Sequence, residues 1–179
     1  MSTARQFIPH YTVDDYRLWT GDWELWSGVA VAMTPSPFGK HSKLLINVGS
    51  ALKTAIDAAE CDATVLGEID WIISSDTVLR PDLVVVCGNE PEKHVEDTPA
   101  IVVEILSEAT RERDLTFKRS IYETQAVEFY LIVDPESDEL TALQLSDDGE
   151  YVALETSESL HIEICDHCPL SINVDRVFR

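Results

Sequence analysis

Three acidic residues lie inside segments that otherwise predict buried strands. Glu104 interrupts the apolar run 100–106, Asp82 opens the run 82–87, and Glu68 lies within a third apolar stretch. An ionised carboxylate in a central strand is costly unless it is paired, hydrogen-bonded or bound to a metal. Glu104 is therefore the most informative residue in the chain.

A structural role for Glu104 fits the sequence as well as a catalytic one. Glu104 would need no ligand if it faced outward at a strand end, or paired with Arg80 or with an arginine of the segment 111–119. Asp82 and Glu104 together favour chemistry more strongly, because two carboxylates on adjacent strand ends can share one Mg²⁺. The backbone carbonyl of Ile105 would supply a third oxygen.

Lys118 is the third residue of interest and follows Glu104 by 14 positions. The sequence predicts a helix over 114–125, on which Asp114, Lys118 and Tyr122 are spaced by four and share one face. One interpretation is an exposed ion pair, which contributes little. In the other, Lys118 reaches a metal-bound water or a phosphate.

The elements that must position these residues predict an α/β fold, a mixed central sheet flanked by helices. We expect a single domain over residues 1–179, with its core at about 11–135 and an acidic C-terminal extension at 136–179. The predicted elements are a short helix after Thr12, a hairpin over Trp23–Met33, a loop over Pro35–Gly39, a helix over His41–Ala59, strands over Ala63–Ser74, Asp82–Cys87, Ala100–Leu106 and Val127–Val133, and a hairpin of Leu140–Leu145 with Tyr151–Leu154.

The chain is strongly acidic, with 33 Asp and Glu against 13 Lys and Arg and a net charge of −20. Residues 120–175 hold 14 acidic residues and no Lys or Arg, directly after a basic cluster over 111–119. A solvated surface explains this acidic segment better than mimicry of nucleic acid or docking of a basic partner. The net charge argues against unspecific binding to nucleic acid or to an anionic membrane.

The four cysteines are unevenly spaced and predict reduced thiols in a cytosolic protein. No stretch is apolar enough to span a membrane, and residues 1–10 lack the apolar centre of a signal peptide, so we expect a cytoplasmic location. Cys165 and Cys168 form a CxxC pair. A turn with free thiols is favoured over a zinc site, because no second CxxC exists and His161 and His167 lack the usual ligand spacing.

The order of short motifs between residues 11 and 135 is more specific than any one of them. The motifs are Glu24-Leu25 with Gly28, Pro37–His41, Arg80-Pro81-Asp82, Val103–Ser107, Thr110, Asp114, Lys118, Tyr122, and Val127 with Tyr130 and Asp134-Pro135. Together they resemble the Uma family of restriction-endonuclease-like proteins, within the PD-(D/E)XK nuclease superfamily. Ala126, Phe129 and Leu131 depart from the pattern in the last motif, but the set of two acids and a lysine elsewhere in the chain is intact.

This resemblance implies a restriction-endonuclease-like sheet with an N-terminal hairpin and a C-terminal β-hairpin. It also implies an endonuclease that uses Mg²⁺ or Mn²⁺ to hydrolyse phosphodiester bonds, with Asp82 and Glu104 as metal ligands and Lys118 as the catalytic lysine. In the superfamily pattern this lysine stands two residues after the acid, where this chain has Leu106, so the resemblance places it on the following helix.

The remaining implied residues surround this set. Accessory roles fall to Glu24, His41, Asp114 and Tyr122, and phosphate contacts to Arg111, Arg113 and Arg119. We expect a nucleic-acid substrate, DNA rather than RNA, and a homodimer because dimers are the commonest oligomers. No aromatic stacking platform is predicted. The alternative is a catalytically inactive nuclease-fold module for binding or assembly, with an acidic C-terminal surface.

Overall fold

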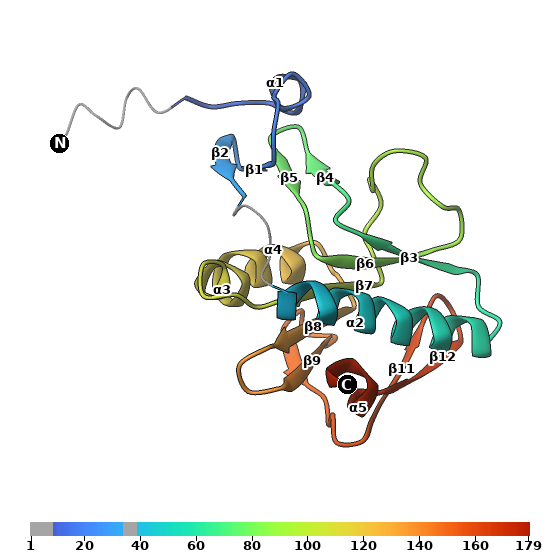
Figure 1. Cartoon of the computed structure of the whole chain (residues 1–179). Coiled ribbons are helices and arrows are strands. Elements are labelled where there is room, and N and C mark those ends of the chain that lie inside the picture. Colours follow the sequence, from blue (N-terminus) through green and yellow to red (C-terminus); the bar gives the residue numbers. More distant parts are fainter. Residues whose placement is uncertain (1–8, 34–38) are drawn as a thin grey trace.

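The structure is a computed structural model that describes residues 9–33 and 39–179. A six-stranded mixed sheet forms its centre (Figure 1). The strand order is β10 (Tyr151–Ala153), β9 (Glu139–Leu145), β8 (Phe129–Asp134), β7 (Ile101–Ile105), β6 (Leu83–Cys87) and β3 (Ala63–Gly67). Strands β7 and β8 are parallel, and the other neighbouring pairs are antiparallel. The predicted α/β fold is confirmed.

A second, four-stranded sheet lies near the N-terminus. Its order is β2 (Val29–Ala32), β1 (Trp23–Trp26), β5 (Thr77–Leu79) and β4 (Trp71–Ser74). The predicted N-terminal hairpin is confirmed as β1 and β2, and α1 (Val13–Tyr16) begins with a capping box between Thr12 and Asp15. The chain passes from β5 directly into β6, so the segment Arg80–Asp82 joins the two sheets.

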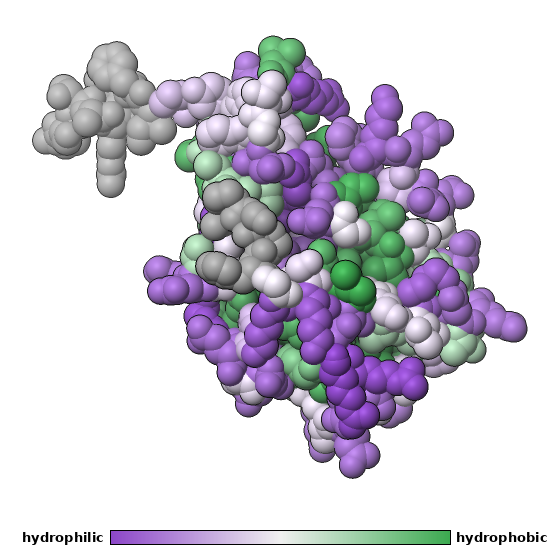
Figure 2. Space-filling model, viewed as in Figure 1, coloured by the Kyte–Doolittle hydropathy of each residue, from purple (hydrophilic) through white to green (hydrophobic). Residues whose placement is uncertain are grey.

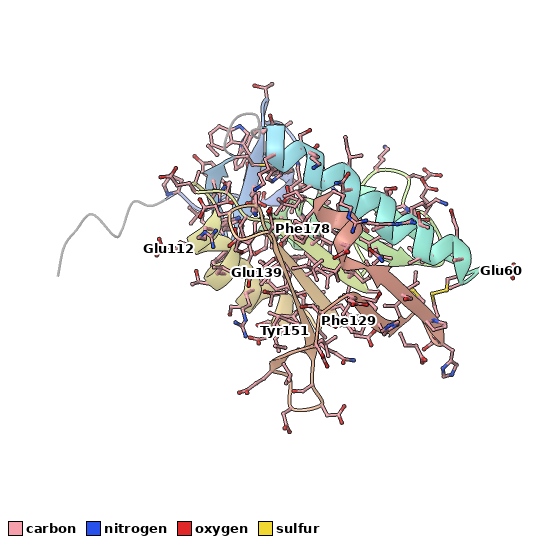
Figure 3. The ribbon with its side chains drawn as sticks, turned by 60° about the horizontal axis from the view of Figure 1, so that its bottom comes forward. Glu60, Glu112, Phe129, Glu139, Tyr151 and Phe178 are labelled. Carbon is pink, nitrogen blue, oxygen red and sulfur yellow. A yellow bond between two sulfur atoms is a disulfide. The ribbon has the colours of Figure 1, made fainter. Side chains whose placement is uncertain are left out.

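Side chains on β7 alternate between two buried apolar clusters, one on each face of the central sheet. Ile101, Val103 and Ile105 belong to the α2-side cluster, which packs under α2 (Gly39–Ala58), and Val102 belongs to the α4-side cluster. Glu104 has the parity of Val102, and its carboxylate therefore lies on the face opposite α2. Figure 3 shows α2 running across one face of the central sheet.

The α4-side face is covered by one irregular helical segment. It consists of α3 (Arg111–Arg113), a π-helical turn η2 (Asp114–Lys118) and α4 (Arg119–Thr124). The helix predicted over 114–125 thus begins earlier, at Arg111, and contains a π turn. Among the described residues, no helix is long and apolar enough to cross a membrane.

The acidic C-terminal segment, residues 136–179, also contributes apolar side chains to the core. The predicted hairpin of β9 and β10 is confirmed, and a further hairpin of β11 (Ser159–Ile164) and β12 (Cys168–Asn173) follows it. Helix α5 (Val174–Phe178) then packs against α2. In both hairpin strands apolar residues alternate with exposed polar ones, so the acidic charge stays at the surface.

The segment 63–74 and Gly39 differ from the secondary structure predicted for them. The strand predicted over 63–74 is wrong, because the chain leaves the central sheet at Glu68, which has a φ of +49°, and enters the second sheet as β4. Glu68 is exposed and is not a strand carboxylate. Residues 35–38 of the predicted loop Pro35–Gly39 lie outside the described residues, and Gly39 begins α2.

The prediction of reduced thiols is also wrong. All four cysteines form disulfides, Cys61–Cys168 and Cys87–Cys165, with Cα–Cα distances of 5.7 and 5.5 Å. The pairing joins residues 107 and 78 positions apart, which sequence spacing cannot reveal. Figure 3 shows disulfide sulfurs near the Glu60 end of α2. The Cys87–Cys165 bond joins the β11–β12 hairpin to β6 of the central sheet, and the Cys61–Cys168 bond joins it to the connection between α2 and β3. No CxxC thiol is left for zinc.

Loss of one disulfide is expected to destabilise the fold less than its sequence separation suggests. The Cys87–Cys165 ring lies inside the Cys61–Cys168 ring, so with the inner bond intact the outer one closes a loop of only about 30 residues. Replacement of both Cys61 and Cys168 by Ser should lower the free energy of unfolding by about 3 to 4 kcal/mol in urea titrations.

The control is a variant with all four cysteines replaced by Ser, whose unfolding should not respond to dithiothreitol. Titration of the denatured, unreduced wild type with a thiol reagent should find no free thiol. Four titratable thiols in the oxidised protein would contradict the pairing.

Candidate active site

Lys118 is buried and faces three carboxylates. Its Nζ lies 2.9 Å from Glu104 Oε1, 3.1 Å from Glu24 Oε1 and 3.8 Å from Asp114 Oδ1. The Lys118 side chain is only 5% exposed, and those of the three acids are 4% exposed or less. The interpretation of Lys118 as an exposed helical ion pair is therefore wrong. Lys118 belongs to a buried cluster of charges, in which the cost of desolvation opposes the attraction between the charges.

Three elements bring this carboxylate–lysine cluster together, one strand from each sheet and one helical turn. Glu24 comes from β1, Glu104 from β7, and both Asp114 and Lys118 from the π turn η2. The backbone N–H of Arg119 donates to the Asp114 carbonyl, five residues earlier, and closes the turn. Both charged ends of the turn are thereby buried against the sheet, an arrangement that π turns often provide at functional sites.

The cluster carries more negative than positive charge. Burial raises the pKa of Glu104 well above its usual range, despite the neighbouring Lys118 ammonium. Burial likewise raises the pKa of Asp114. Burial alone would lower the pKa of Lys118, but the charges of Glu104, Glu24 and Asp114 outweigh it and raise that pKa above the usual value. Lys118 is therefore protonated at neutral pH.

Two side chains donate hydrogen bonds to the same carboxylate oxygen of Glu104. Oε1 accepts from Lys118 Nζ at 2.9 Å and from the Tyr122 hydroxyl at 2.5 Å. Burial raises the pKa of Tyr122 well above the usual value, so the hydroxyl keeps its proton and donates. Among the described residues no donor contacts Oε2, which leaves this oxygen for a proton or a cation.

Asp82 lies beside the cluster, one position beyond the pairing of Leu83 with Val103. Its Oδ2 accepts a 2.6 Å hydrogen bond from the backbone N–H of Ile105, and its Oδ1 lies 3.3 Å from His41 Nε2. Burial would lower the pKa of His41, but its hydrogen bond to Asp82 and the charge of that carboxylate outweigh burial and raise it. The Asp82 charge also raises the pKa of Glu104.

The residues at this site fit a hard divalent cation. Asp82 and Glu104 offer carboxylate oxygens at adjacent strand ends, and the buried Asp114 Oδ1 has no hydrogen-bond partner. Within residues 9–33 and 39–179, no three His, Cys, Asp or Glu side chains are already arranged around one point. Mg²⁺ does not need such a group, because it binds through one or two carboxylates and keeps several waters. The Ile105 carbonyl remains the predicted third ligand.

The structure gives Glu24 a more central place than the accessory role expected from sequence. Besides Lys118, it accepts the backbone N–H of Arg80 at 2.8 Å on Oε1 and the Trp26 indole N–H at 3.0 Å on Oε2. Its position in a short hairpin, 80 residues before Glu104, gave no signal of this burial. Arg80, a sequence candidate for pairing with Glu104, instead donates to Asp70, Asp22 and the Tyr16 hydroxyl.

The three arginines predicted to contact phosphate lie in different surroundings. Arg111 pairs with Asp134 at 2.8 Å and with Glu136 at 3.4 Å. Burial raises the pKa of Asp114 and of Tyr151, and the charges of Arg113 and Arg119, respectively, offset part of that rise. Arg111 is thus already neutralised by its neighbours.

The raised pKa of Glu104 predicts a specific pH dependence of stability. The unfolded chain ionises this carboxyl near its usual pKa of 4.5, whereas the folded chain holds the proton to higher pH. Its stabilising contribution is therefore complete below the unfolded pKa and is lost as pH rises toward the folded pKa. Metal-free Glu104→Gln should gain stability over wild type as pH rises, by about 1.4 kcal/mol per pH unit in this window.

Urea titrations in EDTA between pH 5 and 8 would measure this difference. Glu112→Gln is the matched control, because Glu112 is exposed on α3 and projects from the surface in Figure 3. A constant difference between Glu104→Gln and wild type across this range would contradict the raised pKa.

Comparison with known proteins agrees with this geometry. Residues 13–174 match the model of the Uma2 family, described as "putative restriction endonuclease". An uncharacterized protein of Synechocystis sp. is 26% identical over 145 residues, which are 78% of this chain and 74% of that protein.

A solved structure shares the fold. It is the crystal structure of "a putative nuclease belonging to DUF820" from Anabaena variabilis, with a TM-score of 0.72 and 16% identity. The match covers 94% of this chain and 97% of the other. Since the family model spans nearly the whole described fold, with both sheets and the carboxylate–lysine cluster, the chain belongs to the Uma2 family of restriction-endonuclease-like proteins.

Proposed function

We propose that this protein is an endonuclease that uses Mg²⁺ or Mn²⁺ to hydrolyse phosphodiester bonds in nucleic acid. The observation that carries the proposal is the buried Lys118 among Glu24, Glu104 and Asp114, with Asp82 at the next strand end. An excess of buried negative charge is unfavourable in the protein alone, and a bound divalent cation would offset it. Family membership supports the same chemistry.

Each residue has a role that follows from its contacts. Asp82, Glu104 and the Ile105 carbonyl would hold the cation, which supplies Lewis-acid polarisation of the phosphate and a more acidic bound water. Lys118, held protonated by its neighbours, would stabilise negative charge that develops on the phosphate oxygens. Tyr122 and Glu24 keep Glu104 and Lys118 in place. His41 orients Asp82 through its hydrogen bond.

A specific observation also favours the alternative of an inactive nuclease-fold module. Lys118 and Glu104 already satisfy one another, and both are almost inaccessible to solvent. A purely structural ion pair would look the same. Metal binding separates the two functions, because a structural pair does not need a cation. DNA as substrate, a homodimer and a cytoplasmic location remain further proposals that the sequence favours.

The first test of this function is metal binding. Isothermal titration of wild type with Mn²⁺ should detect one or two ions, and Asp82→Ala/Glu104→Ala should detect none, because the variant loses both carboxylates. Glu112→Gln is expected to bind like wild type. If wild type takes up no ion at millimolar metal, the metal-dependent mechanism fails and the inactive module is favoured.

The second test is cleavage. Lys118→Met preserves the length of the side chain but removes its charge, and should reduce the cleavage rate of plasmid or single-stranded DNA in Mn²⁺ by at least about 100-fold. Lys53→Met is the control, because Lys53 is exposed on α2. Equal rates for Lys118→Met and wild type would exclude Lys118 from the chemistry.

A further inference from the structure

An aromatic pair borders the carboxylate–lysine cluster. The rings of Trp26 and Phe117 are stacked, with centroids 4.2 Å apart and an interplanar angle of 23°. Trp26 ends β1 and Phe117 lies in η2, so the pair spans the contact between the N-terminal hairpin and the helical segment, which lie near each other in Figure 1. Both side chains are partly exposed.

Each member of the pair is connected to a residue of the carboxylate–lysine cluster. The Trp26 indole N–H donates to Glu24 Oε2 at 3.0 Å, and the other oxygen of Glu24 contacts Lys118 at 3.1 Å. Phe117 directly precedes Lys118 in the π turn. The pair therefore borders the residues that hold Lys118.

Packing of the core does not account for Phe117. Trp26 packs at the edge of the α4-side cluster, whereas Phe117 is not among the side chains packed against any buried apolar cluster of the described residues. Its ring contact is with Trp26, at a surface beside charged groups. Trp26 covers one face of this ring, and the part of the ring that stays exposed costs hydrophobic free energy unless something else covers it.

The surface charge makes such a platform useful to a nuclease. The net charge is −20, and Arg111 of the predicted phosphate-contacting set is held by Asp134 and Glu136. Phosphate contacts are therefore a poor source of affinity. Base stacking on an aromatic face is independent of phosphate charge and accepts every base, because every base has a π face.

We propose that Trp26 and Phe117 form a stacking subsite for an unpaired nucleobase next to the scissile phosphate. This proposal rests on the proposed nuclease function and deepens it by naming the substrate class. A paired base in a duplex is already stacked on both faces and cannot use the subsite without being flipped out. The preferred substrate is thus single-stranded nucleic acid or a duplex with an unpaired nucleotide.

Fluorescence anisotropy with labelled DNA of about 12 nucleotides tests this subsite. The probes are a single strand, its blunt duplex, and a strand of equal length with abasic residues, each measured in EDTA and in Ca²⁺ and checked for intactness on a denaturing gel. Wild type should bind the single strand at least about fivefold more tightly than the other two. Phe117→Leu should lose at least about fivefold in affinity for the single strand only.

Three controls separate stacking from folding. Phe117→Trp should restore binding, because it restores an aromatic face. Phe178→Leu makes the same change on α5, across the central sheet, and should bind like wild type. The thermal unfolding midpoint of Phe117→Leu should stay within a few degrees of the wild-type midpoint. Equal binding of the abasic strand, unchanged binding by Phe117→Leu, or no binding of any probe would overturn the proposal.

Failure of this inference is distinguishable from failure of the nuclease function. Cleavage of duplex and single strand is measured separately in Mn²⁺. A protein that binds the single strand through Phe117 but cuts nothing retains the subsite and loses the proposed activity. A protein that cuts duplex DNA equally well with Phe117→Leu retains the activity and loses the subsite.

Discussion

Lys118 carries its charge where water is largely excluded, and that charge must be balanced within the protein. Three carboxylates from separate parts of the chain, Glu24, Glu104 and Asp114, surround it. A buried charge left without its partner costs several kcal/mol, so the hairpin, the central sheet and the π turn must keep their relative positions together. The disulfides and the C-terminal hairpin support the same sheet from its other face.

The balance is incomplete, and this gives the site its chemical character. Three carboxylates facing one ammonium leave negative charge that the protein can relieve by protonating Glu104 or by binding a cation. The first response stabilises the fold and the second makes the site reactive. A protein selected only for stability would replace one carboxylate by an amide or an apolar side chain. The presence of all three acids in this chain is what the proposed metal-dependent function requires.

The sequence revealed the centre of this site because charge inside apolar strands is conspicuous. Glu104 and Asp82 were found in this way, and the spacing of Asp114, Lys118 and Tyr122 indicated a common face. Glu24 was underestimated, because the burial of a four-residue strand depends on a second sheet that no local pattern announces. The disulfides were missed because they join residues distant in sequence. The departure of the chain from the central sheet at Glu68 was missed because it needs a positive φ at a non-glycine residue.

The acidic surface and the nuclease chemistry are compatible if affinity does not come from phosphate contacts. Binding through lysines and arginines releases counterions and weakens steeply with salt. In this chain Lys118 is enclosed by carboxylates, and Arg111 is paired with Asp134 and Glu136. Little counterion release can then accompany binding, so affinity for nucleic acid should depend only weakly on salt. In the proposed mechanism the attraction comes from a cation bound at the carboxylates and from stacking on Trp26 and Phe117, and both act at short range.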